Sequence, residues 1–235
     1  MWKQIGSGGE ATVRDSAVKL LKSVDAAERE YKLMRAATCA YVPRVWRVDA
    51  MLVMPKADAD LLTLLQRARG RPLAPDVARA FIRSMVYAVF TLHSRGIVHR
   101  DVKLENFLVY GLVVRDGRIA GGTVMLTDFG FATRFERGEL LDARIGTPTY
   151  VAPEILAGAP YGPEADVFGL AVCAFALVTG RKPFGSSYRA VLPDARAAWQ
   201  RALPTLAEKT RRLISGGMHL DAAKRLRAVE CARLV

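Results

Sequence analysis

Hydrophobic and polar residues follow one another along the chain in patterns that predict three elements. Residues 25–37 carry apolar side chains at helical spacing, with acidic residues in the first turns, which predicts an amphipathic helix. The apolar run at residues 51–54 predicts a buried strand. A longer apolar run begins at Asp166 and ends at Val178. It is shorter than the roughly 20 apolar residues of a membrane-spanning helix, so we expect a buried core helix and no membrane partner.

Residues 110–122 form a stretch that is longer than a tight turn needs. Asp116-Gly117 within it is a favoured two-residue hairpin turn, so we predict a β-hairpin there. The chain has 235 residues, of which 51% are hydrophobic, and this is enough to bury a substantial core. Its length allows one or two domains. We find no internal repeat and no low-complexity linker.

The chain is strongly basic, with a formal net charge of +12. Such a charge ordinarily suggests an acidic partner such as nucleic acid. However, the lysines and arginines are scattered through the predicted helices and do not cluster. We therefore expect solvated faces and attraction to acidic proteins, and we do not expect nucleic acid as a partner.

Cysteine usage and the N-terminus indicate a cellular compartment. The three cysteines are odd in number and widely spaced, with neither a zinc nor a disulfide pattern, so we expect reduced core thiols at Cys39, Cys173 and Cys231. Residues 1–4 lack the apolar stretch of a secretory signal. We expect an intracellular protein, cytoplasmic or nuclear.

Three short motifs follow one another in a fixed order. His99-Arg100-Asp101 has an asparagine, Asn106, five residues after its aspartate, then comes Asp128-Phe129-Gly130, and then Ala152-Pro153-Glu154. Each tripeptide alone arises by chance in many proteins. Their order, with a glycine-rich segment and a lysine upstream, matches the signature of protein kinases.

The chain is accordingly similar to the eukaryotic-type protein kinase family, in its serine/threonine-specific branch. The resemblance implies an α+β, two-lobed fold with a small β-rich N-lobe that holds one key helix, and a larger helical C-lobe. We place the N-lobe at about residues 1–54, the hinge at 55–57 and the C-lobe at 58–235 of one catalytic domain. It also implies ATP as phosphoryl donor, Mg²⁺ as the metal ion with Mn²⁺ as a substitute, and a monomer that acts on protein serine or threonine.

The resemblance gives roles to four residues around the reaction. Asp101 would orient the attacking hydroxyl and accept its proton, and Lys103 would offset the charge of the transferred phosphoryl group. Asn106 and Asp128 would supply the neutral and the charged oxygen to magnesium.

The upstream motifs would bind the nucleotide. IGSGGEATV at residues 5–13 resembles the kinase glycine-rich loop, with alanine in place of the third glycine, and Ala17-Val18-Lys19 resembles the strand that carries the phosphate-binding lysine. Glu30 on the predicted helix would pair with Lys19, with Glu28 as the reserve choice. The residues expected to contact ATP here are Gly6, Ser7, Gly8, Gly9, Val13, Ala17 and Lys19.

The strand at 51–54 would end at the hinge. Met54 is the expected gatekeeper, and the carbonyl of Pro55 with the N–H of Ala57 would bind the adenine edge. Proline at 55 removes one backbone donor but keeps its carbonyl. Asp60 would contact the ribose.

The family pattern implies further contacts in the larger lobe. Asp166 would accept hydrogen bonds from the backbone around His99 and Arg100, and Arg225 would pair with Glu154.

The same pattern bears on substrate choice. Lys103 is typical of serine/threonine kinases, and Thr147 would shape the pocket beside the acceptor residue. Glu105 lies where related kinases hold a basic substrate side chain, so basic residues near the acceptor are a further expectation. A small-molecule phosphotransferase is disfavoured, because such enzymes lack the peptide-docking segment around Thr147.

The loop after Asp128 departs from the family. Arg100 would commonly receive a phosphothreonine, but the position that aligns with that acceptor is Ala143. We predict activity without loop phosphorylation, with Asp142 or Glu139 supplying a carboxylate to Arg100. The short chain would suit a viral kinase in its host cell, a parasite kinase or a constitutive catalytic subunit. The alternative is a pseudokinase that serves as an ATP-binding or scaffolding module.

Overall fold

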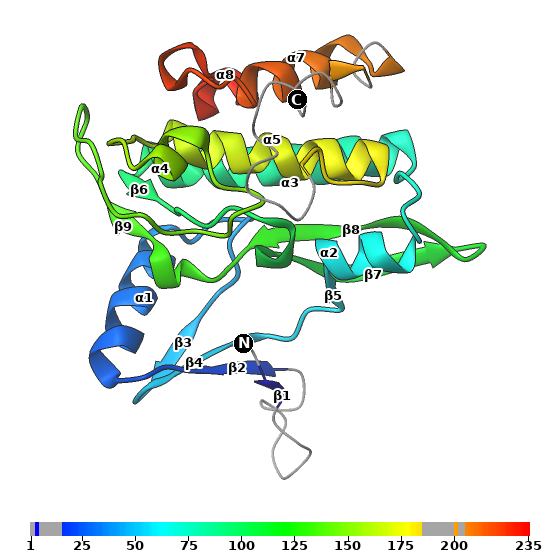
Figure 1. Ribbon diagram of the computed structural model, residues 1–235. Helices are drawn as coiled ribbons and strands as arrows, with labels where there is room; N and C mark the ends of the chain where they lie inside the picture. The colour runs from blue at the N-terminus through cyan, green and yellow to red at the C-terminus, as the bar shows by residue number, and fades with distance from the viewer. Residues whose placement is uncertain (1–2, 5–15, 185–199, 202–204) are drawn as a thin grey trace.

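The computed structural model describes residues 3–4, 16–184, 200–201 and 205–235. One end of the molecule is a four-stranded antiparallel sheet in the order β1-β2-β4-β3, formed by Lys3–Gln4, Ser16–Leu20, Met51–Pro55 and Trp46–Val48. Helix α1, Val24–Ala36, stands beside this sheet (Figure 1). The predicted strand at 51–54 is therefore confirmed as β4, which continues through Pro55.

Helix α1 confirms the helix predicted at residues 25–37. Its N-cap is Ser23, whose hydroxyl accepts a hydrogen bond from the backbone N–H of Ala26 at 3.2 Å. Ala27, Glu30 and Met34 are buried on one face. The helix therefore presents a carboxylate, and not only apolar groups, toward the interior.

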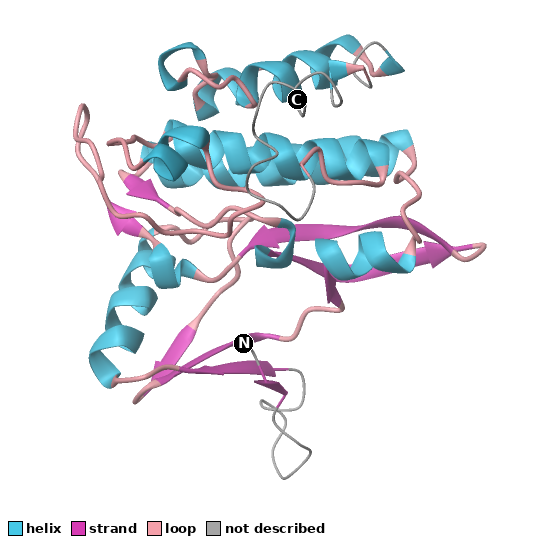
Figure 2. Ribbon diagram, in the orientation of Figure 1, coloured by secondary structure: helices cyan, strands magenta, loops and turns pink. Residues whose placement is uncertain are grey.

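A second sheet joins β5, β7 and β8, which are Ala59–Asp60, Phe107–Arg115 and Arg118–Leu126. Strands β7 and β8 form the predicted hairpin, which projects from the molecule (Figure 2). Its turn has positive φ at both central residues, 49° at Asp116 and 70° at Gly117. A two-residue turn with both φ values positive has the type I′ conformation, which matches the twist of paired strands.

Helices make up the other end of the molecule. Helices α3 (Pro75–Ser94) and α5 (Glu164–Thr179) pack together, and α7 (Glu208–Gly217) and α8 (Ala228–Ala232) lie beyond them (Figure 1). The described residues also form two short helices, α2 (Leu61–Arg67) and α4 (Pro153–Ala157), and a two-stranded sheet of β6 (Ile97–Val98) and β9 (Thr133–Arg134). Short 3₁₀ turns occupy Leu104–Asn106, Phe129–Phe131 and Ala222–Lys224.

Helix α5 confirms the predicted core helix. Every residue from Ala165 to Leu177 is buried. Protein surrounds this helix, which explains why apolar residues lie on all of its sides. Within the described part of the chain, no helix has the length and apolar character to cross a membrane.

Glycine at position 169 lets α5 approach the loop that contains Asp101. A Cβ atom at Gly169 would lie 2.5 Å from the carbonyl oxygen of Val102, which is closer than a side chain permits. The close contact with α5 therefore fixes the position of this loop.

The cysteines are free thiols, as predicted. Cys173 and Cys231 are buried, and burial raises the pKa of both thiols. Cys39 is only half-buried, and it packs against the edge of the core.

Candidate active site

Charged residues from three separate segments meet between the small sheet and the helical part. The ammonium nitrogen Nζ of Lys19, on β2, lies 2.8 Å and 2.9 Å from the two carboxylate oxygens of Glu30 and 2.6 Å from Oδ1 of Asp128. Glu30 is only 2% exposed. The expected Lys19–Glu30 contact is present, whereas Glu28, the reserve choice, pairs with Arg47 and Lys32.

The electrostatics of this cluster favour the charged forms of Lys19 and Asp128. Burial alone would lower the pKa of Lys19, but Asp128 and Glu30 outweigh it and raise that pKa. Burial would likewise raise the pKa of Asp128, but the positive charge of Lys19 holds it below its ordinary value. The cluster therefore presents a fixed cation and a carboxylate to the space between the two parts of the molecule.

Asp128 is held in an uncommon backbone conformation. Its φ of 63° and ψ of 73° lie in the left-handed region, and its Oδ1 atom accepts a weak hydrogen bond of 3.4 Å from the N–H of Gly130. The next residue, Phe129, is buried and packs its ring against His99, with ring centroids 5.1 Å apart. This packing ties Asp128 to the loop that carries Asp101.

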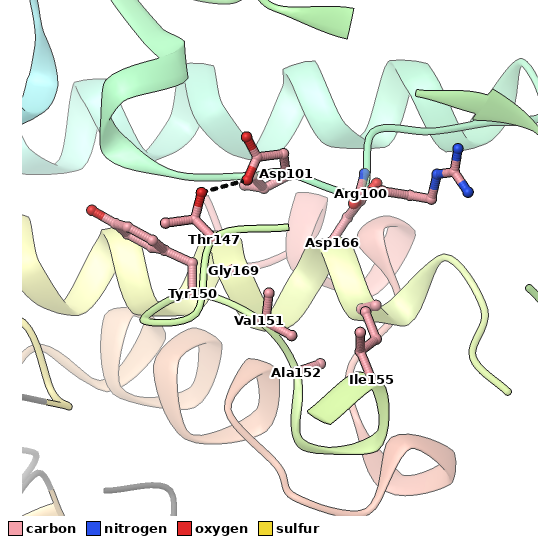
Figure 3. A pocket seen from close by; sticks show the side chains of 11 residues that line it. Arg100, Asp101, Thr147, Tyr150, Val151, Ala152, Ile155, Asp166 and Gly169 are labelled. Atoms are coloured by element: carbon pink, nitrogen blue, oxygen red, sulfur yellow. Dashed lines mark hydrogen bonds between the residues drawn. The ribbon is translucent and has the colours of Figure 1, made fainter. Parts of the chain in front are cut away.

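Asp101 lies at the centre of a second polar cluster. Nζ of Lys103 is 2.6 Å from its Oδ2 atom, and the hydroxyl of Thr147 donates to its Oδ1 atom at 2.8 Å (Figure 3). Lys103 also donates to the Thr147 hydroxyl at 2.8 Å. Asp101, Lys103 and Thr147 thus form a closed triangle, and Asp101 is 5% exposed.

Asn106 forms hydrogen bonds with Asp101 within the same loop. Its amide nitrogen Nδ2 donates to the backbone carbonyl of Asp101 at 2.8 Å and to the carboxylate at 3.3 Å. Since the nitrogen is used in this way, the amide oxygen is the atom of Asn106 that is suited to a metal ion.

The backbone of the Asp101 loop is anchored by a buried carboxylate from α5. Asp166 accepts from the N–H groups of His99 and Arg100, both at 2.8 Å, and lies 2.9 Å from Nε2 of His93. Burial would raise the pKa of Asp166, but its hydrogen bond with His93 lowers it. The expected contacts of Asp166 are confirmed, and they stabilise Arg100 at a φ of 67°.

The cleft beside Asp101 is lined by the segment that leads to α4 (Figure 3). Gly146 has a φ of 110°, and a Cβ atom built on it would lie 2.9 Å from the carbonyl oxygen of Arg100. Only glycine therefore fits there. This close approach lets the following residue, Thr147, reach Asp101.

The residues of the expected hinge follow strand β4 or belong to its end. Met54 is fully buried beneath the hydroxyl of Thr127, but Pro55 still belongs to strand β4. Residues 56–58 have no regular structure. Ala17 pairs with Met54 across the sheet, which places it beside the strand that leads into this connection.

A tyrosine that sequence reasoning missed contacts the hinge. The hydroxyl of Tyr110, on β7, donates to the Pro55 carbonyl at 3.2 Å. The carboxylate of Asp58 accepts from the N–H of Leu112 at 2.8 Å, and the N–H of Asp58 donates to the carbonyl of Val109. The hairpin therefore holds the connection between the two parts of the molecule.

Asp60 has a structural role in the described contacts. It is the N-cap of α2, and its two oxygens accept from the N–H and the hydroxyl of Thr63 at 2.8 Å and 2.6 Å. Ala57 is half-buried in the connection. The glycine-rich residues Gly6, Ser7, Gly8, Gly9 and Val13 lie outside the described residues.

The predicted carboxylate partner of Arg100 was wrong. Nε of Arg100 donates to the backbone carbonyl of Phe131 at 2.6 Å. Within the described residues neither Asp142 nor Glu139 forms an ion pair with Arg100, and Glu139 instead accepts from the N–H of Glu136. The N–H of Glu139 also donates to the carbonyl of Glu136 at 3.0 Å, so residues 136–139 form a turn.

Comparison with known proteins identifies the family. The model of the protein kinase domain matches residues 3–234. The chain is 33% identical over 208 residues to serine/threonine-protein kinase kin-29 of Caenorhabditis elegans, which covers 78% of this chain and 24% of that protein.

Two other relatives agree. Over 135 residues, 54% of this chain and 8% of the relative, the identity to serine/threonine-protein kinase MRCK gamma of Mus musculus is 39%. Over 178 residues, 70% of this chain and 36% of the relative, the identity to CBL-interacting protein kinase 20 of Oryza sativa subsp. japonica is 38%. The chain thus spans about a third or less of the length of these relatives. Its match to the family model, together with the two-part α+β fold, shows that the chain belongs to the protein kinase family.

Proposed function

We propose that this protein is a serine/threonine kinase that transfers the γ-phosphoryl group of ATP to hydroxyl groups of protein substrates. The observation that carries the proposal is the triangle of Asp101, Lys103 and Thr147, with contacts of 2.6 to 2.8 Å. The Lys19–Glu30–Asp128 cluster is linked to the loop of this triangle, because Phe129, which follows Asp128, packs against His99. The names of the relatives support the same conclusion, because two are serine/threonine-protein kinases and the third is a protein kinase.

The mechanism follows from these positions. The carboxylate of Asp101 orients the substrate hydroxyl and accepts its proton as the oxygen–phosphorus bond forms. The bond between the γ-phosphorus and the bridging oxygen breaks, and ADP leaves. Lys103, 2.6 Å from Asp101, offsets the negative charge that the transferred group carries. Lys19 binds the α and β phosphates and is oriented by Glu30.

Asn106 and Asp128 fit a magnesium ion. They offer one amide oxygen and one carboxylate, which are the hard oxygen ligands that Mg²⁺ prefers, and water and phosphate oxygens would supply its other ligands. When bound, the ion would neutralise phosphate charge, and Mn²⁺ would substitute for it. In the part of the chain that the structure describes, no group of three or more acidic, histidine or cysteine side chains could hold a metal by itself.

We place the two lobes at about residues 1–54 and 58–235. The nucleotide base would bind at the connection between them. The Pro55 carbonyl and the Ala57 N–H would contact the adenine edge, and Met54 and Ala17 would line its pocket. Because both oxygens of Asp60 already bind Thr63, a ribose contact there would be shared with the helix cap.

Regulation and substrate choice also belong to the proposal. Ala143 cannot be phosphorylated, so the enzyme is active without a phosphate on this loop. Glu105 follows Asp101 by four residues, at a position where related kinases hold a basic substrate side chain, so we propose basic residues near the acceptor. We propose a monomer that works in the cytoplasm or nucleus.

Phosphate transfer from radiolabelled ATP with magnesium to a basic protein mixture tests the function. The wild type is compared with Asp101→Asn and Lys19→Met, and the product is hydrolysed to identify the phosphoamino acid. Label on serine or threonine that both variants lose would support the kinase. Magnesium-dependent ATP binding without any transfer would instead support the pseudokinase alternative.

A further inference from the structure

The segment before Thr147 is fastened to the loop after α4 by contacts that need no phosphate. Leu141 and Tyr161 form an antiparallel bridge in which each N–H donates to the other's carbonyl at 2.8 Å. The Tyr161 hydroxyl reaches two residues further and donates to the carbonyl of Ala143 at 2.9 Å. Tyr161 itself is only 1% exposed.

A third contact extends the same attachment by one residue. Gly158 has a φ of 72°, and a Cβ atom built on it would lie 1.7 Å from a guanidinium nitrogen of Arg144. The Arg144 side chain therefore lies directly over this glycine. Residues 141–144 are thus held along the stretch 158–161, which follows α4.

This attachment ends three residues before Thr147. Between them lies Gly146, which passes close to the carbonyl of Arg100. Thr147 then donates to Asp101 and accepts from Lys103. A segment that detached at Ala143 would lose its fixed approach to Asp101, because few residues separate the two contacts.

We propose that Tyr161 is a positioning residue that holds residues 141–147 in place and so keeps Thr147 against Asp101. This inference rests on the proposed kinase function, and it names Tyr161 as the side chain that holds this segment. The Arg100 guanidinium faces the same hydroxyl and opposes the rise in its pKa that burial causes.

The first test is limited trypsin cleavage, which does not depend on activity. Arg144 lies inside the attached stretch, and Arg137 lies in the exposed loop before it, so the two cleavage sites provide an internal control. Cleavage of a transiently opened segment follows the population of the open form. In Tyr161→Phe, which removes one buried hydrogen bond, we expect cleavage after Arg144 to be about fivefold faster, with cleavage after Arg137 unchanged.

Two further variants sharpen this test. Leu141→Pro removes the N–H that donates to Tyr161 and should also speed cleavage after Arg144. Tyr87→Phe is the matched control, because its described contact is a ring stack on Tyr41, 5.5 Å between centroids, which phenylalanine retains. It should cleave like the wild type.

The second test separates positioning from simple loss of stability. In Tyr161→Phe the kcat/KM for a protein substrate should fall about fivefold while the KM for ATP stays unchanged. Equal cleavage after Arg144 in the wild type and both segment variants would overturn the proposal, and so would unchanged kcat/KM despite faster cleavage. If the wild type transfers no phosphate but the cleavage difference persists, the attachment stands and the kinase function fails.

Discussion

At the level of single residues, the Thr147 hydroxyl connects the proposed base with its neighbouring cation. It donates to Asp101 and accepts from Lys103, both at 2.8 Å. Thr147→Ala should lower kcat by about 10- to 100-fold, because a hydrogen bond to a charged group contributes roughly 1.5–3 kcal/mol. Thr147→Ser keeps the hydroxyl and should retain most of the activity. Steady-state kinetics with ATP varied would check this, since an equal loss in both variants would exclude the hydroxyl as the cause.

Asp128 gives a prediction about pH. Its pKa is held below the ordinary value of 3.8, mainly by Lys19 against the opposing effect of burial. A depressed pKa means that its charge stabilises the fold above about pH 4 and that this contribution is lost as pH falls through the folded-state value. The urea midpoint of the wild type should therefore exceed that of Asp128→Asn at pH 7, and the difference should shrink below pH 4. A difference that grows toward acid would contradict the ion pair with Lys19.

At the scale of elements, the contact between α5 and the Asp101 loop depends on glycine. Gly169→Ala would place a methyl group 2.5 Å from the Val102 carbonyl. Either the helix or the loop must shift, and such overpacking typically costs about 1–3 kcal/mol of unfolding free energy. We expect lower stability in urea together with reduced kcat, because Asp101 immediately precedes Val102, the point of contact.

Gly121→Ala is the matched control for this prediction. Gly121 lies in strand β8, and a Cβ atom built there meets nothing within 4 Å. Its stability should remain within about 0.5 kcal/mol of the wild type. A loss of equal size in the two variants would show that the approach of α5 to the loop is not the cause.

The elements also show how far the sequence could be interpreted. Helix α1, the hairpin turn and helix α5 follow from local spacing, because each pattern lies within one segment. The contacts of Lys19 with Glu30 and of Asp166 with the His99 backbone could be expected because they join motifs of a family with a fixed order.

Contacts specific to this chain could not be predicted in the same way. The Tyr110–Pro55 hydrogen bond joins residues 55 positions apart, and the Arg100 contact goes to a backbone carbonyl, which no side-chain pattern marks. The path of residues 136–144 decides which carboxylates approach Arg100. Sequence spacing does not specify that path, so the predicted pairing with Asp142 or Glu139 was wrong.

For the whole molecule, the Arg225–Glu154 pair joins the C-terminal region to the segment that leads from Thr147. The guanidinium contacts both Glu154 oxygens, at 2.6 Å and 2.8 Å, and Arg225 also donates to the backbone carbonyls of His219 and Glu164. Its side chain is fully buried, and Glu154 is 11% exposed. The predicted pair is confirmed, and it holds three distant stretches of chain together.

Arg225→Met should destabilise the protein by about 3–5 kcal/mol, because it leaves the Glu154 carboxylate largely buried without its partner. The double variant with Glu154→Gln should recover part of this loss, since the uncompensated charge is then gone. The control is Arg227→Ala, which removes an exposed partner of Glu230 and should change stability by no more than about 1 kcal/mol. Urea unfolding of the four proteins would check this. If the double variant is less stable than Arg225→Met, the guanidinium stabilises the protein through the His219 and Glu164 carbonyls. In that case, removing the carboxylate charge would not restore any stability.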